Sequence, residues 1–371
     1  MGIKIVLEDG FSIQKGAGIG QHTLNLFHQL REFPEVDNVQ LMEKPFLCRI
    51  PSASLRRALY IAWLNSGLQM VLRRKRVDII HFTNYLIPVL RLSKAKYVVT
   101  IHDLTAWRFP ETLPRAYVSY IKWAISHAVK TADLICTVSD AVKREIIELF
   151  DIGSERIYTI YNGVAQALWE TPKIRSDEAV AIKEKFGIES DFLLFVGTLE
   201  ERKNVITLVK AFDDLRSCKR LQLVLVGRPG YGFPKLSKYL DEHHLKDEVI
   251  LTGYVSEEDK IALYDLATIF VYPSLYEGFG IPLVEAMVRK VPIVASRIPS
   301  TEEVAGDAAI YYGNDAFDHE ALAEQILKVL ENGTLRQELM EKGLKRAKEF
   351  SWKKVGQRYV HAYREVLERV T

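Results

Sequence analysis

The stretch "IFVYPSLYEGFGIPLVEAM" (residues 269–287) joins a strand-like run, a glycine-containing loop and a helix-like segment. The run "IFVYPS" is rich in aromatic and β-branched residues, as buried strands are. In the loop, Gly278 and Gly280 let the backbone turn tightly, and Pro282 suits the first turn of a helix. A strand that passes through a tight loop into a helix is the repeating unit of a doubly wound α/β sheet.

The same alternation extends over the whole chain. Near-continuous Val, Ile and Leu runs separated by helical segments indicate parallel sheets covered on both faces. Two sets of such runs predict two facing, Rossmann-like doubly wound domains that bind ligands at the carboxyl ends of their strands, in an interdomain cleft. The predicted strands are "IKIVLE", "VDIIHF", "YVVTIHD", "DLICTVS" and "IYTIYNG" in the first set, and "DFLLFVGT", "QLVLVG", "VILTGYV", "IFVYPS", "PIVAS" and "AAIYYG" in the second.

The length of 371 residues fits two domains of this kind. Strand-like runs are missing between residues 162 and 188, so we expect the boundary there. The predicted division is 1–170 for the first domain, 171–350 for the second, and 351–371 for a C-terminal helix that packs back on the first domain.

The three cysteines, Cys48, Cys136 and Cys218, lie far apart and without CxxC spacing. This argues against a disulfide framework or a zinc site and fits a reducing cytoplasm. The N-terminal residues lead straight into a strand, and no apolar run approaches the length needed to cross a bilayer, so we expect neither a signal peptide nor a transmembrane helix.

The charge is distributed unevenly. Residues 1–170 carry 21 Lys and Arg against 16 Asp and Glu, whereas the remainder carries 29 against 32. Much of the excess lies in residues 54–76, which read as one helix with an apolar face and basic clusters at its ends. Two interpretations stay open: a solvated surface helix, or a surface for an anionic membrane or acceptor. The apolar face is Trp63, Leu64, Leu68 and Leu72, and the clusters are Arg56, Arg57, Arg73, Arg74, Lys75 and Arg76.

A glycine-rich loop, "KGAGIGQHTLNLFHQL" (residues 15–30), precedes an amphipathic helix. Backbone amides of Gly16, Gly18 and Gly20 at a helix start can face an anion. The spacing is not that of the GxGxxG dinucleotide fingerprint, and a plain glycine-rich turn explains the pattern equally well.

A second loop, "FVGTLEERKNVITLVKAF" (residues 195–212), follows a strand. Gly197 comes first, and the adjacent cations Arg202 and Lys203 stand just before the next helix. A solvated surface pair is the simpler interpretation, but a diphosphate carries enough charge for both cations, since Arg offers planar bidentate contacts and Lys a point charge.

The loop of residues 275–281 sets Glu277 before its glycines and Glu285 in the helix after them. The amides around Phe279 to Leu283 predict an anion site at the helix start. Carboxylates beside a phosphate repel it unless they bind hydroxyl groups, so sugar hydroxyls are the expected partners. The alternative is that Glu277 caps the helix and Glu285 is exposed to solvent.

Taken together, these motifs resemble the retaining glycosyltransferases of family 4, over nearly the whole chain. The resemblance implies a GT-B fold, a nucleotide-sugar donor held mostly by the second domain, an acceptor bound on the side of the first, and no required metal or other cofactor. The stretches that carry it are "GAGIGQHT", "TIHDLTAWRFPE", "VSDAVKREI", "IYNGV", "GTLEERKN", "LTGYVSEEDKIALYDLA" and the Glu-x7-Glu pair of "EGFGIPLVE".

Several site roles follow from this resemblance. Glu285 would accept hydrogen bonds from the ribose, and Glu277 would lie by the donor sugar. Arg202 and Lys203 would neutralise the diphosphate as it departs. The remaining expected donor contacts are Gly18, Gly197, the amides of Gly278, Phe279, Gly280 and Ile281, and the backbone of Tyr254 and Val255 beside the base.

His102, in "TIHD", ends a predicted strand. A lone histidine there is commonly structural, but the resemblance implies an active-site residue that hydrogen-bonds the donor sugar or its developing charge, with Asp103 as a weaker candidate. His81 and Asn84 end another strand and are candidates for the acceptor side.

One position departs from the family pattern. Many members have arginine directly after the glycine that ends the strand, whereas this chain has Thr198 there and places its arginine at Arg202. The pattern "GTLE-x-RKN" resembles the branch that includes mannosyltransferases, which implies a retaining transfer of mannose from GDP-mannose to a glycan or a lipid-linked saccharide. The alternatives are a UDP-sugar-dependent transferase and a nucleotide-sugar epimerase. We expect no nucleic-acid partner, and a cytoplasmic enzyme that can also rest on the inner face of the cell membrane.

Overall fold

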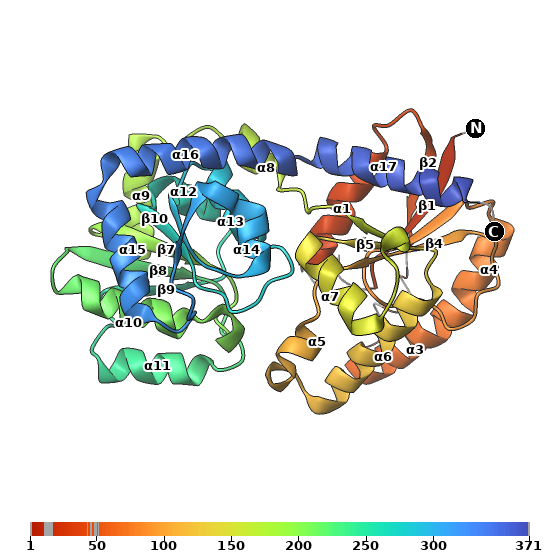
Figure 1. Ribbon diagram of the computed structural model, residues 1–371, viewed down its shortest axis with the longest axis horizontal. Helices are drawn as coiled ribbons and strands as arrows, with labels where there is room; N and C mark the ends of the chain where they lie inside the picture. Colours follow the sequence, from red (N-terminus) through yellow and green to blue (C-terminus); the bar gives the residue numbers. More distant parts are fainter. Residues whose placement is uncertain are drawn as a thin grey trace. The chain divides into compact units, whose positions relative to one another are not determined.

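The computed structural model describes residues 2–10, 18–42, 44, 47, 50 and 52–369, with the side chains of residues 53 and 54 left aside. The chain divides into two compact units. The first unit comprises residues 1–163 and 352–371, and the second comprises residues 164–351. In each unit, helices cover both faces of a central sheet (Figure 1).

The first unit contains a six-stranded parallel sheet in the order β2-β1-β3-β4-β5-β6. The chain leaves β1 toward one side and then returns to continue on the other, so the strand order reverses between β1 and β3. The strands are β1 (Ile3–Glu8), β2 (Val36–Leu41), β3 (Ile79–Phe82), β4 (Lys96–Ile101), β5 (Leu134–Thr137) and β6 (Ile157–Thr159).

The second unit repeats this plan in a parallel sheet of order β12-β11-β10-β7-β8-β9. Its strand order reverses between β7 and β10, which are hydrogen-bonded neighbours. The strands are β7 (Asp191–Val196), β8 (Leu221–Val226), β9 (Val249–Gly253), β10 (Ile269–Tyr272), β11 (Ile293–Ser296) and β12 (Ala309–Tyr312).

The helices of the first unit end with α17, which packs on α1 although the two lie at opposite ends of the sequence. They are α1 (Gly18–Leu30), α3 (Ala53–Asn65), α4 (Gly67–Arg74), α5 (Thr105–Arg108), α6 (Arg115–Thr131), α7 (Asp140–Phe150) and α17 (Trp352–Glu368), with short 3-10 helices η1 (Pro110–Thr112) and η2 (Ser154–Arg156).

The second unit begins with the short helix α8, so the expected boundary at residue 170 falls inside this unit. Its helices are α8 (Gln166–Glu170), α9 (Ser176–Phe186), α10 (Val205–Arg216), α11 (Phe233–Glu242), α12 (Glu257–Leu266), α13 (Ile281–Val288), α14 (Pro299–Ala305), α15 (His319–Glu331) and α16 (Gly333–Ala347), with 3-10 helices η3 (Glu201–Lys203), η4 (Gly306–Ala308) and η5 (Lys348–Phe350).

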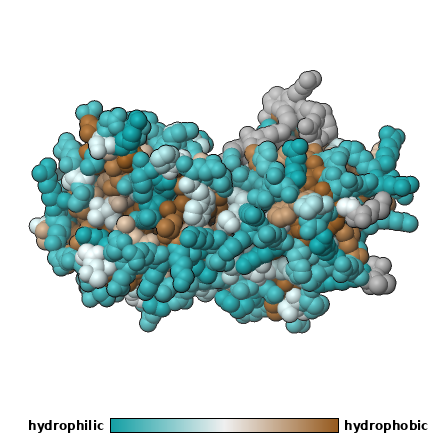
Figure 2. Space-filling model, turned by 90° about the horizontal axis from the view of Figure 1, so that it is seen from above, coloured by the Kyte–Doolittle hydropathy of each residue, from teal (hydrophilic) through white to brown (hydrophobic). Residues whose placement is uncertain are grey.

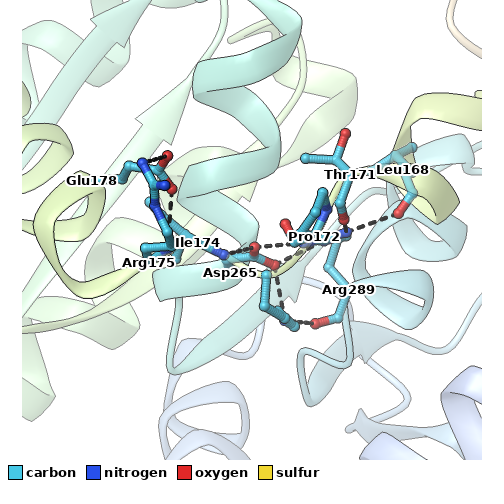
Figure 3. A network of polar contacts seen from close by, with 9 residues as sticks. Leu168, Thr171, Pro172, Ile174, Arg175, Glu178, Asp265 and Arg289 are labelled. Atoms are coloured by element: carbon cyan, nitrogen blue, oxygen red, sulfur yellow. Dashed lines mark hydrogen bonds and ion pairs between the residues drawn. The ribbon is translucent and has the colours of Figure 1, made fainter.

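A buried ion pair fixes the segment after α8 to the second unit. Arg289 donates to both carboxylate oxygens of Asp265 (2.8 and 2.5 Å). The same guanidinium donates to the carbonyl oxygens of Leu168 (2.9 Å) and Thr171 (2.8 Å), as Figure 3 shows. Asp265 also accepts from the amide of Ile174 (3.0 Å). Because both charges are almost fully buried, the pair depends on these hydrogen bonds to offset its lost hydration.

The eleven predicted strand runs all contain strands of the structure, and the prediction of two doubly wound sheets is confirmed. Strand β2 was missed. Its sequence "VDNVQL" has no continuous apolar run, because β2 is an edge strand whose side chains are exposed or only partly buried. Periodicity detects strands that are buried on both faces and loses those at an edge.

The prediction of one helix over residues 54–76 was wrong. Ser66 separates α3 from α4. Leu64, Leu68 and Leu72 point into the core, where their exposed fractions are 4% or less. The predicted apolar face is therefore the inner face of the two helices, and it is not available to a membrane.

The outer surface is mainly polar on the side that Figure 2 shows, with apolar residues in scattered patches. None of the helices within the described ranges is long and apolar enough to span a bilayer.

Candidate functional site

The loops after β7 and β10 meet where the strand order of the second sheet reverses. In open α/β sheets, ligands bind at the carboxyl ends of the strands at this point. The loop after β7 carries Arg202 and Lys203 in η3, and the loop after β10 carries Glu277. The backbone joins the two loops directly, since the amide of Leu275 donates to the carbonyl oxygen of Arg202 (2.9 Å).

Glu277 contacts both cations. Lys203 Nζ donates to Glu277 Oε1, and Arg202 Nη1 donates to Glu277 Oε2 (3.2 Å). Arg202 also donates to the carbonyl oxygen of Tyr276 (2.8 Å) and to Glu200 (2.6 Å). Two carboxylates thus hold the two adjacent cations in fixed positions at the carboxyl end of the sheet. The sequence had suggested that these cations face a diphosphate, but it had not linked them to Glu277.

Burial and charge act in opposite directions on this cluster. Burial alone would raise the pKa of Glu277, but Lys203 and Arg202 outweigh it and lower the pKa to about 2. The carboxylate is therefore ionised at neutral pH. For Lys203, burial lowers the pKa of the amine, Glu277 opposes this shift and Arg202 adds to it. The ring of the buried Tyr272 lies 5.5 Å from Lys203 Nζ.

Glu285 occupies a second, adjacent position on α13. Its carboxylate accepts from Lys260 Nζ (2.8 Å) and from the hydroxyl of Tyr264 (2.9 Å). Only 6% of Glu285 is exposed, so the expectation of a solvent-exposed helical residue does not apply. Burial opposes the charge of Lys260, but Glu285 and Glu257 raise the pKa of this amine. Lys260 thus joins the candidate site, although no sequence motif marks it.

The glycine loop before α13 has the conformation that its sequence suggests. Gly280 has φ +99°, a left-handed value that residues with a Cβ rarely adopt. Helix α13 begins at Ile281, with Pro282 in its first turn. Phe279 is buried against Phe350, at a ring distance of 5.5 Å, which fixes the loop between Gly278 and the helix.

The carboxyl ends of β7 and β8 approach each other at two glycines. A Cβ on Gly227 would lie 1.9 Å from the carbonyl oxygen of Gly197, so any larger residue would push the strand ends apart. The packing requirement thus falls on Gly227, whereas a Cβ on Gly197 would lie 3.2 Å from the ring of Phe195.

An exposed aromatic residue follows β9. Tyr254 is 75% exposed, and the guanidinium of Arg228 lies over its ring at 4.8 Å. Both residues follow the carboxyl ends of neighbouring strands, β8 and β9. The sequence analysis predicted a role only for the backbone of Tyr254 and Val255. In the structure, the exposed ring of Tyr254 adds a flat surface, and Arg228 lies against it.

In the first unit, His102 follows β4. Its Nε2 donates to the carbonyl oxygen of Thr83 (2.9 Å) at the end of β3. Burial lowers the pKa of His102, against the opposing effects of Thr83 and Asp103. A neutral imidazole that donates through Nε2 presents Nδ1 as an acceptor, which suits a hydroxyl group and does not suit a developing negative charge.

A second histidine lies beside His102. His22 of α1 packs edge-on against it, at a ring distance of 5.2 Å. His22 contacts Asn162 (3.0 Å) through Nδ1 and the hydroxyl of Tyr359 in α17 (3.3 Å) through Nε2. Through Tyr359 and His22, helix α17 therefore supports the position of the His102 ring.

The expectation that His81 lines an acceptor site was wrong. His81 is fully buried, with its two ring nitrogens bonded to the hydroxyl groups of Tyr363 (2.7 Å) and Thr100 (2.7 Å). Its role is to join α17 to the sheet. Asn84 is nearly buried and accepts from the amide of Leu86 (2.7 Å), as a turn residue does.

The glycine-rich loop is described only from Gly18 onward, where α1 begins. Gly18 is exposed, and no atom lies within 4 Å of a Cβ built on it. Gly16 lies outside the described residues. Gly20 is buried within the first turn of α1.

The chain is similar to known glycosyltransferases. Residues 178–346 match the family described as glycosyl transferases group 1, and residues 18–167 match glycosyltransferase family 4. Among similar proteins, the O-antigen chain mannosyltransferase B of Escherichia coli is 31% identical over 94% of this chain and 96% of its own length. The O-antigen chain mannosyltransferase RfbU of Salmonella typhimurium is 27% identical over 81% and 84%.

The fold also matches solved structures. The Anabaena protein HepE, crystallised with UDP and glucose, superposes with a TM-score of 0.73 at 17% identity, covering 99% of this chain and 100% of that one. The expectation of a GT-B fold built from two Rossmann-like units is confirmed. Sequence similarity over almost the full length, the two family matches and this fold lead to one conclusion: the chain belongs to glycosyltransferase family 4, in the branch that resembles mannosyltransferases.

Proposed function

We propose that this glycosyltransferase transfers mannose from GDP-mannose to a glycan or a lipid-linked saccharide, with retention of the anomeric configuration. The observation that carries the proposal is the pair Arg202 and Lys203, held by Glu277 where the strand order of the second sheet reverses. The names of the similar O-antigen mannosyltransferases support mannose as the transferred sugar.

The cation pair supplies what the leaving group needs. When a nucleoside diphosphate departs from an anomeric carbon, negative charge grows on its phosphate oxygens. Cations that are already in place lower the barrier without reorganising at the moment of reaction. Arg202 is fixed by Glu200, Tyr276 and Glu277, so its guanidinium meets this requirement. On this basis we propose that the reaction requires no metal.

The carboxylates suit the hydroxyl groups of the donor. Glu277 is ionised at neutral pH, because Lys203 and Arg202 overcome the effect of burial on its pKa. It can therefore accept hydrogen bonds from the donor sugar while keeping the cations in place. Glu285, held by Lys260 and Tyr264, would accept from the ribose. His102 would accept a hydroxyl hydrogen bond from the donor sugar at Nδ1.

Front-face attack is the proposed route to retention. Double displacement needs a carboxylate nucleophile next to the anomeric carbon, as in glycosidases that use two carboxyl groups about 5 Å apart. Glu277 is bound to two cations and Glu285 to an amine and a phenol, so neither is a free nucleophile. We therefore assign the acceptor's proton to a phosphate oxygen of the donor.

A UDP-sugar is the alternative donor, favoured by the fold neighbour HepE, which was crystallised with UDP and glucose. Diphosphate, ribose and cation contacts are the same for both nucleotides, so only the contacts with the base distinguish GDP-mannose from a UDP-sugar. An epimerase of the same fold would need no acceptor and would return an altered nucleotide sugar.

The test needs only the full chain and two donors. The nucleotide sugar that raises the melting temperature in chelator-containing buffer, GDP-mannose or UDP-glucose, is the donor. The second measurement is slow hydrolysis of that donor without an acceptor. NMR should then show α-mannose as the first anomer released from GDP-mannose. Stabilisation by UDP-glucose alone would establish the alternative donor, and release of β-mannose would exclude retention. Loss of turnover with chelator would refute metal independence. An altered nucleotide sugar would identify an epimerase.

A further inference from the structure

Exposed apolar side chains concentrate on one part of the first unit. Of fourteen large apolar residues that are exposed in the described chain, seven lie between residues 55 and 123. Isolated exposed apolar residues are normal, but a cluster marks an interaction site. The seven are Leu55, Leu59, Met70, Val89, Leu90, Leu92 and Trp123, with exposed fractions from 40% to 56%.

Helix α3 presents an apolar outer face. Tyr60 and Leu64 point inward and are buried, whereas Leu55, Leu59 and Ala62 face away from the core. A surface helix of a soluble protein normally carries polar residues on its outer face. The outer face of α3 therefore departs from the usual pattern of a surface helix.

The segment of residues 88–92 forms an apolar loop beside α3 and α4. Val89 and Leu90 donate their amides to the Asn65 side chain (2.7 and 3.0 Å). Leu92 donates its amide to Gln69 Oε1 (2.9 Å), and its carbonyl oxygen accepts from Arg73 (3.2 Å). These backbone groups are satisfied inside the protein while the side chains face outward. Such a loop can enter an apolar medium without exposing unpaired backbone groups to it.

Helix α6 extends the same surface. His127 bonds to the carbonyl oxygen of Pro88 (3.1 Å), and Trp123 stacks on His127 at 5.6 Å. From α3, Arg57 lies over the rings of Tyr117 (5.1 Å) and Tyr120 (5.9 Å) of α6. The three helices and the loop thus form one continuous surface, which lies on one side of the first unit (Figure 1). We call it the basic face.

The basic face has a strong charge bias. Residues 50–131 contain 13 Lys and Arg and only 3 Asp and Glu, which are Asp78, Asp103 and Glu111. Arg91 pairs with Asp133. Within the described part of the chain, no carboxylate lies within 4.0 Å of the charged atoms of Arg56, Arg57, Arg73, Arg74, Lys75 or Arg76.

We infer that the basic face binds an anionic lipid bilayer, with Leu90, Leu92 and Trp123 entering the interface and the arginines contacting lipid headgroups. Apolar side chains flanked by unpaired cations are the pattern of interfacial membrane binding. Basic residues near an anionic surface each add to the attraction, and a tryptophan suits the boundary between headgroups and acyl chains. A solvated surface would need no apolar loop. This inference does not depend on which donor the enzyme uses.

Sedimentation of the full chain with sucrose-loaded vesicles tests the inference. We expect binding to equimolar phosphatidylcholine and phosphatidylglycerol, little binding to phosphatidylcholine alone, and release by high salt. The variant Arg73→Glu, Arg74→Glu, Arg76→Glu should bind at least about tenfold more weakly. Leu90→Ser with Leu92→Ser should weaken binding at least about fivefold. Brominated lipid should quench the tryptophan fluorescence of the wild type more than that of the Trp123→Phe variant.

A matched variant controls for net charge. Lys342→Glu, Lys345→Glu, Lys348→Glu changes the charge equally on exposed residues of the second unit and should bind as the wild type does. Circular dichroism melts check folding, and donor hydrolysis without lipid should be unchanged in every variant, which separates this test from that of the donor. Binding indifferent to lipid charge, equal loss in the control variant, or no binding to anionic vesicles would overturn the inference.

Discussion

Lys203 Nζ donates a hydrogen bond to Glu277 Oε1, although 74 positions separate the two residues in sequence. The contact arises because β7 and β10 are neighbours in the sheet, so the loops that follow them meet. It joins two motifs that the sequence presents separately, and it belongs to a carboxylate that contacts both cations.

Lys203→Ala should reduce donor hydrolysis by about 10²–10³-fold, because one preorganised charge at the leaving group is lost. Lys203→Arg should recover part of the loss, since the charge returns with a different shape. Release of GDP from GDP-mannose measures both. The matched control is Lys210→Ala in α10, where the amine lies over the ring of Tyr239. Equal activity of Lys203→Ala and Lys210→Ala would remove Lys203 from the reaction.

Glu277→Gln should destabilise the second unit, with a dependence on pH. The pKa of Glu277 falls from 4.5 to about 2 on folding, so its ionised form stabilises the fold above pH 4.5 and this contribution is lost as the pH falls toward 2. The shift corresponds to about 3 kcal/mol at neutral pH. Urea unfolding should show a large difference from the wild type at pH 7 that shrinks below pH 4.5.

Glu178→Gln is the control for this experiment, because Glu178 forms an exposed pair with Arg175 and should contribute about 1 kcal/mol or less. A Glu277→Gln deficit that stays constant from pH 7 to pH 3 would show that Glu277 is not ionised by its cation partners.

Glu285→Ala should weaken GDP binding by about 1.5–3 kcal/mol, the usual loss for a hydrogen bond to a charged group. Calorimetric titration with GDP measures it. Glu257→Ala is a close control, since Glu257 also pairs with Lys260 (3.0 Å) but is more exposed. If both variants bind GDP equally, the effect belongs to the environment of Lys260 and the assignment of Glu285 to the ribose fails.

Tyr254→Ala should weaken GDP binding by about 1–3 kcal/mol, the range for stacking of a base on an aromatic ring. Binding of inorganic pyrophosphate should not change, because it has no base. Tyr231→Ala removes a half-exposed tyrosine that follows β8, and this variant should bind both ligands as the wild type does. An equal loss of GDP and pyrophosphate affinity would place Tyr254 away from the base.

Arg289→Ala should cost up to about 3–5 kcal/mol of stability, because it removes the buried partner of Asp265, which keeps only Lys173 Nζ (2.8 Å) and the Ile174 amide. The carbonyl oxygens of Leu168 and Thr171 lose their donor in the same variant, so proteolysis should cut more readily near residues 168–174. Arg297→Ala breaks the exposed pair with Glu302 and should change stability little. Equal melting temperatures of the two variants would contradict the prediction.

Much of the candidate site was predictable from local sequence. Gly280 and Pro282 predicted a tight loop that leads into a helix. In the structure, Gly280 is left-handed and the helix starts at the next residue. The adjacent cations Arg202 and Lys203 stood after a clear strand. Lys260 and Arg228 carried no such signal, because each joins the site only when its own strand or helix packs beside another.

Errors arose where a pattern had two physical meanings. The apolar stripe of Leu64, Leu68 and Leu72 fits a core or a membrane equally, and the structure turns it toward the core. His81 lies at a strand end as an active-site residue would, yet Tyr363 from the far end of the chain buries it. A single sequence does not show which distant segment covers a given side chain.

Apolar periodicity and glycine or proline backbone preferences act over a few residues, so the two parallel sheets and the loops that carry the chemistry were predictable from local patterns. Which loops share a site depends on tertiary packing. The parallel order β10-β7 brings Glu277 to Lys203, and the return of α17 brings Tyr359 to His22. Such contacts depend on strand order and on long-range packing, which local periodicity does not encode, since the same strands in another order would keep their patterns and lose the site.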